Sequence, residues 1–237
     1  MKDLDKPAKK NNNHKKHLIF AAIFAVLAVA FTAVVKFVDV RPVVLENSPV
    51  GLASLNEPVR NLFSYNEQGV NSTWDKITDI TLAALLATSI YFVILGLVQI
   101  INRKSPKKVD RELKLLAFFY LAVAIVYVVF EKLLIINHRP VLMDGALEAS
   151  YPSSHVLFAL TLAGSAILLT RNYIKPKFAV AINLVVALLA LVVTFGRLMA
   201  GVHWFTDILG SILISATLLA VFAATCSHRK KDQPANQ

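Results

Sequence analysis

The stretch ITLAALLATSIYFVILGLVQII, residues 80–101, decides the fold, because its 22 residues include no charged side chain. A helix of about 20 apolar residues spans the hydrocarbon core of a bilayer. A second uncharged stretch, of 18 residues, runs from Leu18 to Val35. Of the 237 residues, 56% are hydrophobic, whereas a soluble domain is usually about 45–50% apolar. The sequence therefore predicts an integral membrane protein with one domain.

Six apolar segments are candidates for membrane spans. Their expected bounds are 18–38, 77–101, 113–136, 155–170, 178–195 and 206–226. Only helices and closed barrels satisfy their backbone hydrogen bonds in lipid, and these segments lack the alternation of barrel strands. We therefore expect an all-α, polytopic protein with six transmembrane helices, the first of which is an uncleaved signal anchor.

The placement of lysine and arginine predicts the orientation. With the N-terminus inside, the cytoplasmic pieces hold 18 of the 25 basic residues, as the positive-inside rule requires. These pieces are 1–17, 102–114, 171–177 and 227–237. We expect both termini in the cytoplasm and the protein in the plasma membrane of a cell.

The expected organisation is a membrane domain over 18–226 between two cytoplasmic tails. The basic tail over 1–17 is expected to be disordered, and residues 227–237 form the second tail. The longest outer loop, 39–76, contains SLNEPVRNLFSYNEQG, which mixes apolar and charged residues. This stretch is either a short helix lying in the membrane interface or a plain connector.

The net charge of +10 does not indicate a nucleic-acid partner. The basic residues lie between apolar segments, and no basic run is interleaved with aromatic residues. The single cysteine, Cys226, excludes a disulfide within the chain. The sequence does not determine an oligomeric state.

Three polar clusters fall on the outer side of this topology. The first, KLLIINHRP, contains Lys132 and Arg139, whose spacing of two helical turns lets both side chains project from one face. Snorkelling explains Lys132 equally well. In the second, PSSH, Ser153 and Ser154 can cap the following helix or help its first turn to bind a phosphate. Capping does not explain His155.

The third cluster, GRLMAGVHWFTD, places His203 and Asp207 four residues apart. On one helical face, the carboxylate can hold one imidazole nitrogen and leave the other as a nucleophile or base. Arg197 lies six residues before His203, across a turn marked by Gly201. Together the clusters supply fixed cations that suit a phosphate, one histidine that can attack phosphorus and another that can protonate the departing oxygen.

In order and internal spacing, these clusters resemble the motifs of the type 2 phosphatidic acid phosphatase family. The matching residues are Lys132-x6-Arg139-Pro140, Pro152-Ser153-Ser154-His155 and Arg197-x5-His203-x3-Asp207. The resemblance implies an integral-membrane lipid phosphatase with a helical core that uses neither a metal nor a cofactor. Its substrate would be an isoprenyl diphosphate, a phosphatidylglycerophosphate or a phosphatidate.

The resemblance also implies a role for each matching residue. His203 would form a phosphohistidine and Asp207 would orient it, while His155 would protonate the leaving group and then activate water. The implied phosphate ligands are Lys132, Arg139, Ser153 and Arg197.

Two positions depart from the family's usual pattern. Ser154 stands where the family usually has glycine, and its side chain either crowds the phosphate or adds a hydroxyl ligand. Gly196 stands where a serine usually precedes the arginine, which removes one possible hydrogen bond.

Three other functions would use the same residues. A phosphotransferase would pass the phosphoryl group to an acceptor other than water. A transporter would bind an anionic lipid without chemistry, although transporters bind near the midplane of the bilayer. A metal hydrolase would use His155, His203 and Asp207 as ligands, and the nearby cations oppose it.

Overall fold

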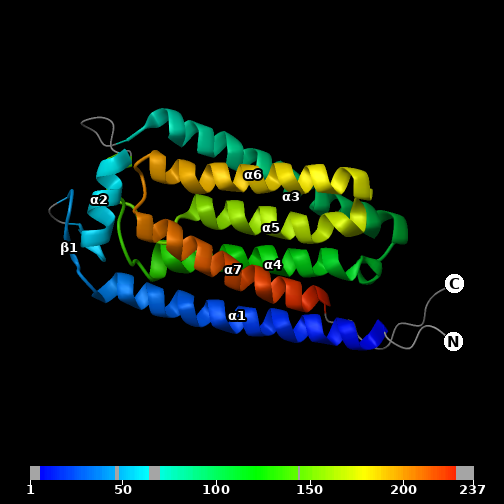
Figure 1. Cartoon of the computed structure of the whole chain (residues 1–237). Helices are drawn as coiled ribbons and strands as arrows, with labels where there is room; N and C mark the ends of the chain where they lie inside the picture. The colour runs from blue at the N-terminus through cyan, green and yellow to red at the C-terminus, as the bar shows by residue number, and fades with distance from the viewer. Residues whose placement is uncertain (1–5, 46–47, 64–69, 144, 228–237) are drawn as a thin grey trace.

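Long antiparallel helices make up the protein in its computed structural model, which confirms the all-α class (Figure 1). The structure describes residues 6–45, 48–63, 70–143 and 145–227. Its α-helices are α1 (Lys6–Phe37), α2 (Ala53–Phe63), α3 (Ser72–Arg103), α4 (Arg111–Val128), α5 (Ser154–Tyr173), α6 (Pro176–Met199) and α7 (Phe205–Ser227). The short elements are strands β1 (Arg41–Pro42) and β2 (Pro49–Val50), which pair antiparallel, the 3₁₀ turn η1 (Pro106–Lys108) and the π-helical turn η2 (Val129–Leu133).

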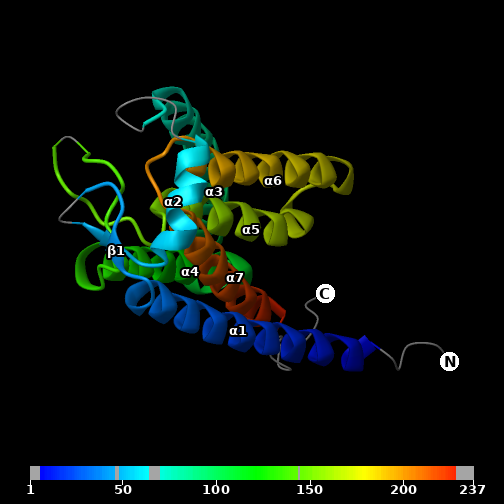
Figure 2. The same ribbon diagram turned by 60° about the vertical axis from the view of Figure 1, so that its left-hand side comes forward.

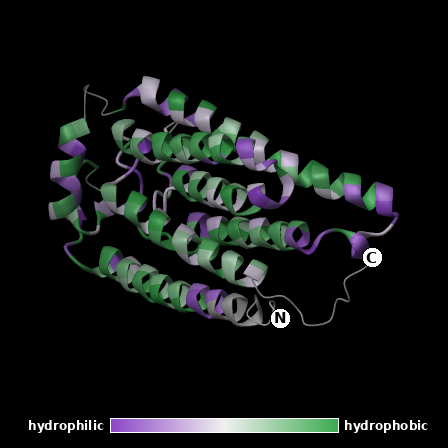
Figure 3. Ribbon diagram, turned by 45° about the vertical axis from the view of Figure 1, so that its right-hand side comes forward, coloured by the Kyte–Doolittle hydropathy of each residue, from purple (hydrophilic) through white to green (hydrophobic). Residues whose placement is uncertain are grey.

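Six of these helices, all but α2, are long and apolar enough to cross a membrane. This confirms the number of predicted spans and their order. Figure 3 shows apolar residues along most of each long helix and hydrophilic residues gathered toward the ends.

The start of α1 differs from the sequence prediction. Disorder over residues 1–17 is wrong from Lys6 onward, because α1 begins there; residues 1–5 lie outside the described ranges. Once an apolar span has nucleated a helix, each further residue adds a backbone hydrogen bond, and lysine is a good helix former. His14 Nδ1 also lies 2.9 Å from the backbone oxygen of Ala224, which joins the beginning of α1 to the end of α7.

Helix α5 lies at the centre of the bundle. In the most apolar 18-residue stretch of α5, 56% of the residues are buried, whereas the corresponding figure is 17% in both α1 and α3. It packs on α6 and α7, while α1 covers α7 and α3 covers α6. Helix α5, which begins with the PSSH cluster, is therefore the helix that the others surround.

The short helix α2 lies across one end of the bundle (Figures 1 and 2). Its buried Asn56 fixes it there: Nδ2 donates to Gly51 O and to Thr206 Oγ1, both at 2.9 Å, and Oδ1 accepts the Thr206 N–H at 3.1 Å. A helix in this part of the loop over 39–76 is thus confirmed for Ala53–Phe63. Residues 64–69 of the predicted stretch lie outside the described ranges.

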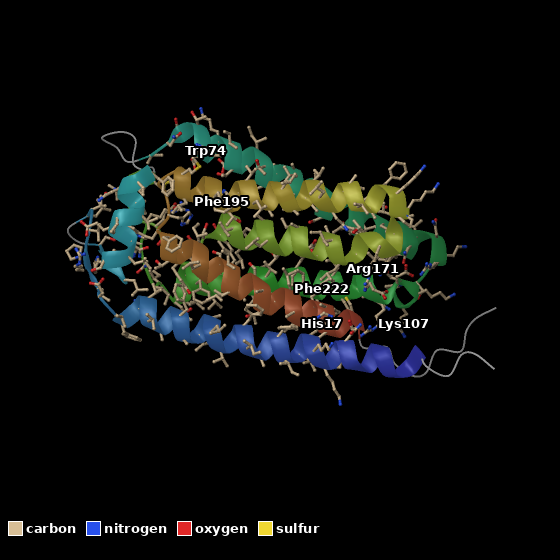
Figure 4. The ribbon with its side chains drawn as sticks, viewed as in Figure 1. His17, Trp74, Lys107, Arg171, Phe195 and Phe222 are labelled. Carbon is tan, nitrogen blue, oxygen red and sulfur yellow. The ribbon has the colours of Figure 1, made fainter. Side chains whose placement is uncertain are left out.

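The three polar clusters meet at the α2 end of the bundle. The antiparallel order of the helices brings to it the ends of α4 and α6 and the beginnings of α3, α5 and α7. Figure 4 shows Trp74 at this end and His17, Lys107 and Arg171 at the opposite one. Residues far apart in the chain can therefore form one site.

Candidate active site

His203 and Asp207 form a buried imidazole–carboxylate pair. His203 Nδ1 lies 3.4 Å from Asp207 Oδ2, and the two side chains are 1% and 0% exposed. The predicted shared helical face is wrong, because α7 begins only at Phe205 and His203 lies in the preceding turn. Asp207 instead reaches back from the first turn of α7, and its Oδ2 also accepts the Trp204 N–H at 2.9 Å. An acidic residue three positions after a helix N-cap commonly bonds the N-cap N–H in this way.

The surroundings of His203 keep its imidazole neutral. Its pKa is lowered well below the usual value by burial, then by the positive charges of Arg139 and Arg197 and by His155. Burial and nearby cations both disfavour the protonated ring. Neither ring nitrogen has a hydrogen-bond partner within the described ranges, but Nδ1 faces the Asp207 carboxylate, so Nε2 is the nitrogen available for a nucleophilic role.

The PSSH cluster forms the beginning of α5. Ser153 is the N-cap residue, yet its hydroxyl makes no capping hydrogen bond, and within the described part of the chain its Oγ has no partner. The Ser153 N–H donates to Asp207 O at 3.3 Å, and Ser211 Oγ donates to Ser153 O at 2.9 Å. These bonds hold the N-terminus of α5, with Ser154 as its first residue, against the His203–Asp207 pair.

The first cluster does not adopt the helical geometry that its spacing suggested. The π-helical turn ends at Leu133, so Lys132 and Arg139 do not share a helical face. The residue before a proline disfavours helical backbone, and Arg139 precedes Pro140. The Arg139 N–H instead donates to Glu148 O at 3.0 Å, and its Nε lies 3.2 Å from Glu148 Oε2.

Lys132 and Arg139 differ in burial as a result. The Arg139 side chain is 10% exposed, and its charge lowers the pKa of His203. The Lys132 side chain is 71% exposed and lies 3.9 Å from Glu131. The structure therefore brings Arg139 to the histidines and leaves Lys132 at the rim.

Arg197 enters the site from the last turn of α6 and meets a polar face of α3. Its Nη1 donates to Asp75 Oδ1 at 2.5 Å and to Thr78 Oγ1 at 3.2 Å, and lies 3.8 Å from Asp79 Oδ1. The guanidinium is almost fully buried, and these contacts hold it in place.

Asp79 also contacts the second histidine. His155 Nε2 lies 2.9 Å from Asp79 Oδ1, and among the described residues His155 Nδ1 has no hydrogen-bond partner. Sequence reasoning missed Asp75, Thr78 and Asp79. Two signals could have found them. Asp79 is a carboxylate inside the predicted span 77–101, and ionisable groups in membrane helices usually mark function. The three residues are also spaced so that they share one helical face.

Buried polar atoms without a partner are concentrated in this site. Within the ranges that the structure describes, they include Arg139 Nη1, Ser153 Oγ, His155 Nδ1, Arg197 Nε and His203 Nε2. Folded proteins pair nearly all of their buried polar groups. The three donors from Arg139, Ser153 and Arg197, placed around a neutral imidazole, suit the oxygens of a phosphate.

In the described part of the chain, no group of three or more histidine, cysteine, aspartate or glutamate side chains is arranged to hold a metal ion.

The structure explains why glycine stands before Arg197. A Cβ atom on Gly196 would lie 2.4 Å from Thr78 Cγ2 and 3.3 Å from Trp74 Cε3. Close packing of α6 on α3 therefore leaves no room for a serine. The hydroxyl that such a serine would supply comes instead from Thr78, which bonds Arg197 across the helix interface.

We expect Gly196→Ser to lower the free energy of unfolding by about 1–3 kcal/mol, the usual cost of overpacking, and to weaken catalysis. Thermal unfolding in detergent and kcat/KM would measure the two effects. Thr78→Ser should rescue the variant, because it removes Cγ2 and keeps the hydroxyl. Gly96→Ser is the matched control, since a Cβ there meets nothing within 4 Å; an equal loss in this control would contradict the explanation.

Comparisons with known proteins agree with the site. Residues 134–231 match the model of the PAP2 superfamily, a range that contains Arg139, His155, Arg197, His203 and Asp207. No curated protein matches the chain.

The fold resembles the crystal structure of a transmembrane PAP2-type phosphatidylglycerolphosphate phosphatase from Bacillus subtilis. The TM-score is 0.62 at 17% sequence identity, over 92% of this chain and 99% of the other. A protein with this fold and six apolar helices is a multi-pass membrane protein. Residues 134–231 are therefore similar to the PAP2 superfamily, and the chain has the fold of a transmembrane PAP2-type phosphatase.

Proposed function

We propose that the protein hydrolyses a phosphomonoester or diphosphate of a membrane lipid through a phosphohistidine on His203, without a metal ion. The observation that carries the proposal is the buried, neutral imidazole of His203 with donors around it that have no partner within the described ranges. A neutral imidazole is a nucleophile, and preorganised donors stabilise the charge that develops on phosphoryl oxygens.

In the first step the lone pair of His203 Nε2 attacks phosphorus, and the bond from phosphorus to the leaving oxygen breaks. His155 donates a proton to that oxygen from Nδ1, so that the lipid departs as a neutral alcohol, or as a monophosphate if the substrate is a diphosphate. Asp207 stabilises the positive charge that the phosphorylated imidazole acquires, because its carboxylate lies 3.4 Å from Nδ1.

In the second step His155 Nδ1 takes a proton from water while the water oxygen attacks phosphorus. The bond between phosphorus and Nε2 breaks, inorganic phosphate leaves, and the neutral His203 is restored. His155 again carries the proton that the next leaving group needs. Arg139 and Arg197 hold the phosphoryl oxygens in both steps.

The hydroxyl of Ser153 and the N–H groups at the beginning of α5 complete the proposed phosphate site. Lys132 belongs to it through the family resemblance, and the Ser154 hydroxyl would add a ligand at a position where the family usually has glycine. Lys132 would reach the phosphate by turning its exposed side chain away from Glu131.

A lipid substrate suits the position of the site. The reacting groups gather where six membrane-spanning helices end, so a phosphate headgroup can enter while its chains stay in the bilayer. We place this end outside the cell and both termini in the cytoplasm, because the basic residues on the opposite side follow the positive-inside rule. The domain division into a membrane domain and two tails follows the same topology.

We expect the purified protein to release phosphate from a lipid phosphate or diphosphate in detergent with excess EDTA present. A panel of undecaprenyl diphosphate, phosphatidylglycerophosphate and phosphatidate would identify the substrate. Loss of activity in EDTA that returns with a divalent cation would contradict the metal-independent mechanism. Saturable binding without turnover of any lipid would contradict hydrolysis and favour transport.

A further inference from the structure

The carboxylate of Asp79 holds His155 much as Asp207 approaches His203, so the site contains two histidine–carboxylate pairs. Asp79 Oδ1 lies 2.9 Å from His155 Nε2. The two residues are 76 positions apart in the chain and come from α3 and α5. The closest approach of the other pair is 3.4 Å.

This contact decides which nitrogen of His155 is available. An ionised carboxylate only accepts hydrogen bonds, so the imidazole donates from Nε2, and Nδ1 is left to exchange the proton of the reaction. Nδ1 is buried and has no partner in the described part of the chain. Without Asp79 the ring could rotate or take the other tautomer, and neither form would present the required atom.

The two pairs differ in their access to water. The side chains of His203 and Asp207 are 1% and 0% exposed, whereas those of His155 and Asp79 are 24% and 56% exposed. The more exposed pair is the one whose histidine must meet the attacking water in the second step of the proposed reaction.

The neighbouring Asp75 provides a contrast on the same helix. It lies one turn before Asp79 and bonds Arg197, and within the described ranges it makes no hydrogen bond or ion pair with His155. A general electrostatic role for the acidic face of α3 would make both carboxylates equivalent. A positioning role for His155 belongs to Asp79 alone.

We propose that Asp79 is a positioning residue for the acid and base chemistry of His155, an inference that rests on the proposed function. Its carboxylate fixes the ring and the tautomer so that Nδ1 faces the leaving oxygen and later the water.

The test uses two substrates that differ in their need for an acid. An alkyl lipid phosphate has a leaving alcohol that must be protonated, whereas p-nitrophenyl phosphate has a leaving phenolate that needs no proton. We expect Asp79→Asn to lower kcat/KM for the lipid by about 10- to 100-fold, which corresponds to one charge-assisted hydrogen bond. For p-nitrophenyl phosphate, kcat/KM should stay within a few-fold of the wild type, because it reports steps only up to cleavage of the ester.

Two further measurements separate positioning from a structural defect. With p-nitrophenyl phosphate, Asp79→Asn should give a burst of p-nitrophenol and accumulate phosphoenzyme, because activation of water also needs His155. In a His155→Ala background, Asp79→Asn should have no further effect, as expected for residues that act as one unit.

The control is Asp75→Asn, which should change kcat/KM for both substrates by the same factor. Equal losses for the two substrates in Asp79→Asn would overturn the inference in favour of a structural role. A gain in kcat/KM for the lipid would show instead that Asp79 obstructs the phosphate. If the wild type hydrolyses neither substrate, the proposed function itself fails.

Discussion

His203→Ala should lower the rate of phosphate release by about 10³-fold or more, as removal of a catalytic nucleophile usually does. Nε2 of this residue is the proposed bond-forming atom, and no other histidine within the described ranges combines its burial with a facing carboxylate. Phosphate release from the best lipid of the panel would be measured in detergent, with thermal unfolding to check that the fold is retained.

A labelling experiment sharpens this prediction. Wild-type protein quenched in alkali during turnover of a phosphorus-labelled substrate should carry acid-labile label on histidine, and His203→Ala should carry none. His138→Ala is the matched control, because this histidine contributes its backbone oxygen to Trp204 and has no part in the proposed chemistry. Normal turnover by His203→Ala would contradict the assignment of the nucleophile.

Asp207→Asn should lower kcat by about 10²- to 10⁴-fold, the range seen when a buried charge or donor that supports a transition state is removed. The proposed intermediate places a positive charge on the His203 ring. A neutral amide cannot balance that charge in a site where Asp207 is 0% exposed. Its oxygen can still accept the Trp204 N–H, so the start of α7 should be preserved.

Asp207→Ala separates the two roles of this residue. It should lose activity to a similar extent and should also unfold at a lower temperature, because the N-cap hydrogen bond with Trp204 is lost at a cost of about 0.5–2 kcal/mol. If Asp207→Asn retains normal kcat, the charge of Asp207 has no part in the reaction. If both variants unfold early, the loss is structural.

The sequence predicted the membrane spans well because the signal is local. An uninterrupted apolar run in lipid has few alternatives to a helix, so six spans and their order follow from counting residues. The ends of the helices were less predictable. Backbone hydrogen bonding carries α1 back to Lys6, and α4 passes into a π-helical turn that stops at Leu133, before the predicted end at residue 136.

The sequence also predicted most residues of the site, because each of the three motifs is short and has a fixed spacing between its polar residues. It could not supply their geometry. His203 approaches Asp207 through a turn and a helix N-terminus, and Arg139 sits in a strand-like segment instead of on a helix with Lys132. In both cases the same spacing is compatible with several backbone paths, and the surrounding packing selects one.

By itself, then, the sequence determined the membrane class, the six spans and three motifs typical of a phosphatase. Only the tertiary structure revealed the contribution of α3. Arg197 and Asp75 are 122 residues apart, and His155 and Asp79 are 76 apart. Gly196 is explained by Thr78, a residue on the neighbouring helix that no local pattern connects to it. Helix packing makes these contacts, because it brings side chains together according to the positions of whole helices and not according to their separation along the chain.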